Sequence, residues 1–218
     1  MKRFFLFGIG ILLFAGVANA QTAGGDNAFT PLPKPAPGEK VATFGGGCFW
    51  SMSEAMSELK GVNKVVSGYA GGTKVNPTYE EVGTQITGHA EVVQIYYDPK
   101  VISYATIAKS FFFAHDPTEL NRQGPDEGTD YRSIAFYRTP EEKTILLNTI
   151  KEVNATKHYS DPIVTQVVAF KAFYPAEKYH QGYYRLHGDN PYISNVSEPK
   201  VMKFRKAMSA ELKPEFQK

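Results

Sequence analysis

Hydrophobic and polar residues are distributed along this chain in short periodic segments, which predict a mixture of strands and helices. One predicted strand is Ala90–Tyr97, which has the aromatic and β-branched composition typical of strands. Its period of two places Glu91 on the same face as Val93, Ile95 and Tyr97. A carboxyl group on this strand is therefore expected among apolar neighbours.

A helical period begins directly after a glycine-rich turn. Phe49, Met52 and Met56 recur at spacings of three and four residues, which predicts a helix over residues 48–59. The polar face of this helix is expected to consist of Ser53, Glu54 and Glu58.

A later helix has a clear start signal in its sequence. Thr139 and Glu142 have the spacing of a capping box, and Pro140 takes the first helical position, so a helix through Leu146 and Ile150 is predicted. The other predicted strands are residues 64–69, 131–137 and 163–173, and the other predicted helices are residues 103–115, 176–186 and 199–212. Because strands and helices mix without strict β-α-β alternation, we expect a two-layer α+β fold with helices on one side of the sheet.

The first forty residues differ in composition from the rest. Residues 1–20 have the pattern of a secretory signal peptide, with Lys2 and Arg3 before an apolar stretch and a small-residue ending at Ala20. Residues 21–40 are rich in Pro, Gly and Ala and are expected to form a flexible linker, and residues 41–218 are expected to form a single catalytic domain. We therefore expect an exported protein, periplasmic or secreted, without stable membrane insertion after signal cleavage.

The net charge and the number of cysteines limit the kinds of function that the protein can have. The chain has 24 Lys and Arg against 22 Asp and Glu, and removal of Lys2 and Arg3 with the signal would balance the two. This balance argues against nucleic acid as a partner. The chain has one cysteine, Cys48, so no internal disulfide can form, and an exported protein is then left with an intermolecular partner or a reactive thiol.

Cys48 stands where a strand-like run and three glycines, Gly45 to Gly47, meet the first predicted helix. A thiol in the first turn of a helix faces unpaired N–H groups and the positive end of the helix dipole, and both favour the thiolate. The alternative is a buried, inert cysteine that acts as a small hydrophobic residue. The glycines and the aromatic residues that follow Cys48 favour a nucleophile.

Six motifs of this chain, in order, resemble those of the A-type peptide methionine sulfoxide reductases. They are Gly47-Cys48-Phe49-Trp50, Gly68-Tyr69-Ala70-Gly71-Gly72, Thr87-Gly88-His89-Ala90-Glu91-Val92-Val93, His115-Asp116-Pro117-Thr118, Asn121-Arg122-Gln123-Gly124 and Tyr131-Arg132-Ser133. The resemblance spans residues 41–206. It implies a ferredoxin-like α+β core with long loop excursions, no metal or organic cofactor, and reduction of the S epimer of methionine sulfoxide, free or in oxidised proteins.

The resemblance also assigns roles to residues. It implies that Cys48 attacks the sulfoxide sulfur, that Phe49 and Trp50 bind the methyl group, and that Glu91 is the general acid whose pKa burial would raise. Tyr79 and Tyr131 match tyrosines that hydrogen-bond the sulfoxide oxygen, and Asp126 and His180 match residues that support the site. Without the resemblance, each of these side chains could simply pack or face solvent.

The chain departs from the family pattern at several positions. Many relatives carry a second cysteine near the C-terminus, and Ile193 stands where one common class places it. We therefore expect a one-cysteine cycle, in which an external thiol, from a thioredoxin-like protein, glutaredoxin or glutathione, resolves a sulfenic acid at Cys48. Ser51 replaces a usual glycine, and Asp130 replaces a usual glutamine. We expect a monomer.

Two other function classes remain open from the sequence alone. A Cys-His hydrolase or transferase would use Cys48 with His89, His115 or His180 as base. A noncatalytic binding module would explain the 13 tyrosines and 15 phenylalanines. His89 and Glu91 also form a His-x-Glu pair, but the cysteine pair of zinc deaminases is missing, which argues against a metal.

Overall fold

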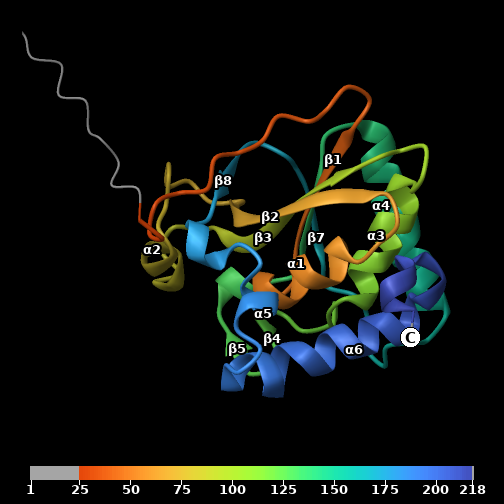
Figure 1. The fold of residues 1–218 in the computed structure, drawn as a ribbon. Coiled ribbons are helices and arrows are strands. Elements are labelled where there is room, and N and C mark those ends of the chain that lie inside the picture. Colours follow the sequence, from red (N-terminus) through yellow and green to blue (C-terminus); the bar gives the residue numbers. More distant parts are fainter. Residues whose placement is uncertain (1–24, 218) are drawn as a thin grey trace, which may run out of the picture.

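A six-stranded sheet with helices on one face forms the centre of the molecule in the computed structural model, which describes residues 25–217 (Figure 1). The strand order is β7-β6-β1-β3-β2-β8, and β6–β7 is the parallel pair in an otherwise antiparallel arrangement. The strands are β1 (Lys40–Gly45), β2 (Val62–Ala70), β3 (Ala90–Tyr97), β6 (Ile134–Tyr137), β7 (Gln166–Ala169) and β8 (Phe173–Pro175). A separate hairpin pairs β4 (Arg122–Gln123) with β5 (Asp126–Glu127).

Four of the helices, α1, α3, α4 and α6, begin within a residue of where the sequence predicts them. The α-helices are α1 (Phe49–Ser57), α2 (Tyr79–Gly83), α3 (Tyr104–Phe113), α4 (Pro140–Ala155), α5 (Tyr183–Leu186) and α6 (Glu198–Ala207). Shorter turns of helix are η1 (Thr129–Tyr131), η2 (Lys178–His180), η3 (Ile193–Ser197), η4 (Ser209–Glu211) and η5 (Pro214–Phe216). Among the helices of the described residues, none has the length and apolar character needed to cross a membrane.

The predicted α+β class is confirmed, and the sheet separates two apolar clusters. The four neighbouring strands β6-β1-β3-β2 form the middle of the mixed sheet, and α1 and α3 follow β1 and β3 along the chain. On β3, Val93, Ile95 and Tyr97 join the core beneath the helices, while Val92 and Tyr96 join a cluster on the other face. The predicted alternation along β3 is therefore confirmed.

The prediction of one last strand over residues 163–173 is wrong. The segment forms β7 and β8 at opposite edges of the sheet, and the chain crosses between them. On the way, the ring of Phe170 packs edge-on against Phe136 and lies 3.9 Å from the guanidinium carbon of Arg138. Phe173 is buried in the same cluster. The alternation divides the segment between the two faces of the sheet: Ile163 and Val167 pack against the core beneath the helices, and Val168 and Phe170 pack against the second cluster.

The helix predicted over residues 176–186 is also interrupted. Gly182 adopts a left-handed backbone conformation (φ 68°) between η2 and α5. The side chain of Gln181 accepts a hydrogen bond from the amide of Ser67 (2.9 Å) and donates one to its carbonyl (3.0 Å). These contacts tie the break to β2 and turn the following residues toward α1.

The described part of the predicted linker lies against the domain. The amide of Thr30 donates to the carbonyl of Ala176, and the amide of Lys178 donates to that of Ala28. Tyr96 donates its hydroxyl hydrogen to the carbonyl of Pro33 (2.8 Å). Residues 28–33 therefore contact the sheet and the segment that follows β8.

Glu54 and Glu58, which the sequence places on the polar face of the first helix, are not exposed to solvent. Both side chains are buried, and each carboxylate meets an arginine from the C-terminal part of the chain. Arg185 of α5 approaches Glu54 at 2.7 Å, and Arg205 of α6 approaches Glu58 at 2.7 Å. These two ion pairs fix α1, which begins at the cysteine, against α5 and α6.

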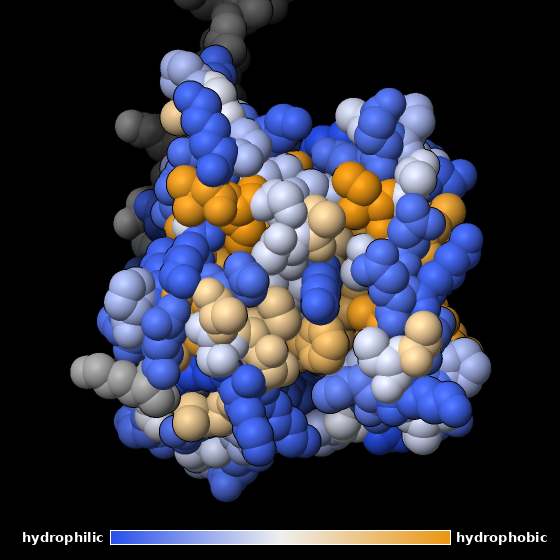
Figure 2. Space-filling model, turned by 90° about the vertical axis from the view of Figure 1, so that its right-hand side faces the viewer, coloured by the Kyte–Doolittle hydropathy of each residue, from blue (hydrophilic) through white to orange (hydrophobic). Residues whose placement is uncertain are grey.

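Apolar side chains are also exposed on one face of the molecule. Figure 2 views the molecule from the side of α3 and α4 and shows apolar residues in the middle of this face, surrounded by polar ones. Leu147 of α4 and Met202 of α6 are among the exposed large hydrophobic residues. The core therefore does not take up all of the apolar side chains that the helices present.

Removal of Arg205 is expected to destabilise the fold strongly. In Arg205→Ala, Glu58 keeps its fully buried position without a cation, so the free energy of unfolding should fall by about 3–5 kcal/mol. Urea denaturation followed by circular dichroism measures this change. The double variant Glu58→Gln/Arg205→Met should recover most of the loss, and a loss in Arg205→Ala no larger than that of an exposed substitution would contradict the role of this pair.

Candidate active site

Cys48 caps the N-terminus of α1, where the chain turns sharply out of β1. Gly47 has φ 77°, and a Cβ at this position would lie 2.5 Å from the side chain of Gln123. A Cβ on Gly46 would lie 2.6 Å from the ring of His115. The glycines are needed because other segments pack directly on the backbone before the cysteine.

Glu91 of β3 lies beside the same turn. Its Oε2 accepts a hydrogen bond of 2.9 Å from the amide of Phe49, the residue after Cys48. The pKa of Glu91 is raised to about 8, mainly by burial; the Phe49 amide opposes the shift, and the charges of Asp130 and Asp126 add to it. The carboxyl group is therefore protonated at neutral pH, as the position of Glu91 on an apolar strand face predicts.

The thiol of Cys48 does not titrate as the sequence predicts. Burial raises the pKa of Cys48 well above its usual value, and the charge of Glu91 raises it further. The Trp50 amide and the Tyr192 hydroxyl lower it, but by less. The expectation of a resting thiolate is therefore wrong: the helix N-terminus acts in the expected direction, and loss of solvation outweighs it because Cys48 is only 6% exposed.

Aromatic rings surround the cysteine. Trp50 stacks on Tyr183 with ring centroids 3.9 Å apart, and it donates its indole N–H to Nδ1 of His180 (3.1 Å). The ring of Phe49 lies 4.8 Å from that of His180, and the ring of Tyr192 meets Trp50 edge-on at 5.7 Å. The rings of Phe49 and Trp50 are thus fixed next to Cys48, where an S-methyl group could pack against them.

Tyr79 and Tyr131 reach the site from two different elements. The amide of Tyr79 donates to Glu177 (2.9 Å), and the carbonyl of Tyr131 accepts from the amide of Gly47 (3.1 Å). Burial first and the charge of Glu91 second raise the pKa of both hydroxyls, so they remain neutral donors. Two hydroxyl donors therefore accompany the protonated carboxyl of Glu91.

Asp126 joins the site through a tyrosine that the sequence analysis did not select. The Tyr192 hydroxyl donates to Oδ2 of Asp126 (2.6 Å), and this hydroxyl is one of the groups that lower the pKa of Cys48. Lys200 of α6 lies 3.6 Å from the same carboxylate oxygen. The one signal for Tyr192 was its place beside Ile193, where relatives have a second cysteine.

The three histidines that a Cys-His hydrolase could use, His89, His115 and His180, form hydrogen bonds to other groups. His89 accepts from the amide of Gly72 and bonds the carbonyl of Lys74, and His115 bonds the carbonyl of Phe111 and Ser133. Burial lowers the pKa of both His115 and His180 to about 4. His180 uses the lone pair of Nδ1 to accept from Trp50, and its lowered pKa makes it a weak base, so the structure does not favour a Cys-His hydrolase at this thiol.

The two departures from the family pattern also lie at the site. Ser51 donates its hydroxyl hydrogen to the carbonyl of Cys48 (3.1 Å), inside the first turn of α1. Asp130 is 3% exposed, and its Oδ1 has no hydrogen-bond partner among the described residues. Its charge is one of the causes that raise the pKa of Glu91. Residues 25–217 contain no group of three or more side chains that could bind a metal ion.

Comparisons with known proteins agree with this geometry. The family model "Peptide methionine sulfoxide reductase" matches residues 40–212. A peptide methionine sulfoxide reductase MsrA from Polynucleobacter asymbioticus is 45% identical over 175 residues, covering 80% of this chain and 92% of its own length. One from Haloquadratum walsbyi is 48% identical over 173 residues, covering 79% and 98%.

Solved structures are similar as well. The reduced form of Mxr1 from Saccharomyces cerevisiae aligns with a TM-score of 0.67 and 32% identity, covering 72% of this chain and 91% of that one. Methionine sulfoxide reductase A of Corynebacterium diphtheriae aligns with a TM-score of 0.62 and 28% identity, covering 78% and 91%.

Alkylation of Cys48 in the unliganded protein should report its raised pKa. The rate constant for reaction with iodoacetamide is expected to keep rising with pH beyond 9.0, the usual value of the group. In Glu91→Gln the profile should move to lower pH, because the second cause of the shift is removed. A rate that is already constant by about pH 7 would mean a resting thiolate and would contradict this account of the site.

Proposed function

Because this chain belongs to the peptide methionine sulfoxide reductase family, as an enzyme of the A type, we propose that it reduces the S epimer of methionine sulfoxide with Cys48 as nucleophile and Glu91 as general acid. The observation that carries the proposal is the hydrogen bond between Glu91 and the Phe49 amide. It holds a carboxyl group with a pKa of about 8 beside the turn that presents the only thiol of the chain.

The proposed first half-reaction moves one oxygen atom. The sulfur of Cys48 attacks the sulfoxide sulfur, and Glu91 gives its proton to the sulfoxide oxygen as the S–O bond weakens. Tyr79 and Tyr131 donate hydrogen bonds to the same oxygen. The carboxylate formed on Glu91 then accepts the proton of the Cys48 thiol. This transfer is needed because the high pKa of Cys48 keeps the thiol protonated before the reaction. The oxygen leaves the substrate sulfur as water, which then attacks the Cys48 sulfur and breaks the newly formed S–S bond. The products are methionine and a sulfenic acid on Cys48.

The pocket for the methyl group is proposed to be formed by Phe49 and Trp50. His180 and Tyr183 hold the indole ring by a hydrogen bond and a stacking contact, so the wall of the pocket is set before substrate arrives. Asp126 holds Tyr192 near the sulfur. Preorganised groups of this kind lower the cost of placing the sulfoxide in the reactive orientation.

The second half-reaction is proposed to use an external thiol. A thiol attacks the sulfenic sulfur and releases water, and a second thiol frees Cys48 from the mixed disulfide. The support for this route is that the chain has a single cysteine. A thioredoxin-like protein, glutaredoxin or glutathione has the required chemistry, and no organic cofactor or metal is needed.

Cellular setting and assembly are also part of the proposal. The signal-like composition of residues 1–20 supports export, with a periplasmic or secreted mature protein, although these residues lie outside the described part of the chain. The enzyme is proposed to act as a monomer on oxidised proteins and on free methionine sulfoxide.

Loss of the acidic proton of Glu91 is expected to slow the reaction. Glu91→Gln keeps an oxygen for the Phe49 amide but cannot donate an acidic proton, so kcat on free methionine S-sulfoxide should fall by about 10²–10⁴-fold. Wild-type kcat/KM should decline as pH rises through about 8, because the carboxyl group then loses its proton. The exposed Glu80→Gln is the control, and an undiminished rate in Glu91→Gln would remove Glu91 from the mechanism.

A single turnover without reductant should leave one oxygen atom on the enzyme. One molecule of methionine should form per enzyme, and mass spectrometry should find the oxygen on Cys48, trapped by dimedone as a sulfenic acid adduct. Cys48→Ser should give neither product. An intramolecular thioether, amide or other closed product on the oxidised enzyme would defeat the external-thiol step.

A further inference from the structure

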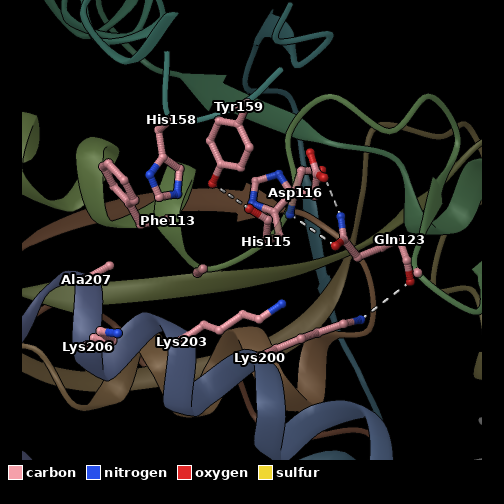
Figure 3. Close-up of a pocket in the computed structure, with 12 residues that line it drawn as sticks. Phe113, His115, Asp116, Gln123, His158, Tyr159, Lys200, Lys203, Lys206 and Ala207 are labelled. Carbon is pink, nitrogen blue, oxygen red and sulfur yellow. Dashed lines mark hydrogen bonds between the residues drawn. The ribbon is translucent and has the colours of Figure 1, made fainter. Parts of the chain in front are cut away.

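A cavity of about 680 Å³ lies next to the candidate active site, between α6 and the segments that follow α3 and α4. Figure 3 shows its two sides: Lys200, Lys203 and Lys206 project from α6 on one, and the rings of Phe113 and Tyr159 lie on the other. Its size is that of sites which hold a small ligand or a few side chains of a peptide.

Two side chains separate the cavity from the turn that carries Cys48. His115 and Gln123 line the cavity, and these are the side chains that pack on Gly46 and Gly47 directly before Cys48. At one end, Lys200 also approaches Asp126, the partner of Tyr192. Cys48 itself does not line the cavity. An occupant would therefore lie beside the reaction without contacting the sulfur.

The chemistry of the lining selects an anionic occupant with apolar groups. Within residues 25–217, Lys200 alone of the three lysines forms an ion pair. The only carboxylate of the lining, Asp116, accepts two hydrogen bonds from Thr118, at 2.9 and 2.6 Å. Lys203 and Lys206 are exposed and face an aromatic surface in which His158 packs edge-on against Phe113 (4.9 Å).

We propose that this cavity binds an acidic segment, with an apolar side chain, of the polypeptide that carries the methionine sulfoxide. The inference rests on the proposed function and names a class of protein substrate. A small anionic thiol held here could not reach Cys48, whereas a chain can occupy the cavity while another of its residues enters the site. The long, unbranched methionine sulfoxide side chain suits a thiol that is only 6% exposed, which favours substrate over a protein reductant.

Short synthetic peptides with one methionine S-sulfoxide test this inference. One series carries Glu-Phe-Glu at increasing distances on either side of the sulfoxide, and the matched series carries Gln-Phe-Gln. With dithiothreitol as reductant, kcat/KM of each peptide is divided by that of free methionine S-sulfoxide. The acidic series should give the higher ratio at its best spacing, and added salt should reduce the difference.

The variant Lys203→Glu/Lys206→Glu should lower the ratio for the best acidic peptide about tenfold. The control Lys64→Glu/Lys100→Glu makes the same charge change at exposed positions outside the cavity and should keep the wild-type ratio. Equal ratios for the two peptide series, or equal losses in both variants, would overturn the proposal. So would a lysine effect confined to the KM of a thioredoxin-type reductant.

Binding is measured separately from turnover. A fluorescent acidic peptide with methionine in place of the sulfoxide should bind the wild-type protein more tightly than Lys203→Glu/Lys206→Glu, as read by anisotropy. If the protein reduced no sulfoxide, the proposed function would fail, while this binding difference would still decide whether the cavity holds an acidic segment. Equal anisotropy in both proteins would reject the site.

Discussion

The burial of the Glu91 carboxyl group against the amide of Phe49 is the constraint on which the site depends. The contact joins β3 to the first residue of α1, so it fixes Glu91, the proposed acid, relative to Cys48, the proposed nucleophile. The same burial holds the proton on Glu91 at neutral pH. A carboxylate in that place would repel the thiolate, so the site favours a protonated acid before substrate binds.

The rest of the fold keeps α1 in place. Its two buried carboxylates, Glu54 and Glu58, meet arginines that come more than a hundred residues later in the chain. Because removing either arginine would leave a buried charge, the C-terminal helices cannot shift without loss of stability. On the other side of the cysteine turn, His115 and Gln123 pack on glycine backbone. The turn before Cys48 is thus enclosed by residues that are distant from it in the sequence.

Parts of the site could be predicted from the sequence where the role of a residue depends on its immediate neighbours in the chain. The glycines before Cys48 indicated close backbone approach, and the alternation along β3 placed Glu91 among apolar residues. The thiol pKa could not be predicted, because the helix effect is local while desolvation depends on how distant segments cover Cys48. Tyr192 was missed for the same reason: its partner Asp126 belongs to a different loop. The split of residues 163–173 escaped notice because apolar alternation does not tell which edge of a sheet a strand joins.

The position of Trp50 gives this molecule an optical property of its own. It is the only indole of the chain, it stacks on Tyr183, and its N–H is held by His180 within the ring of side chains that encloses the reactive sulfur. Intrinsic emission excited at the tryptophan band therefore comes from a single fluorophore in the candidate active site, and the native protein carries its own spectroscopic label for events at that site.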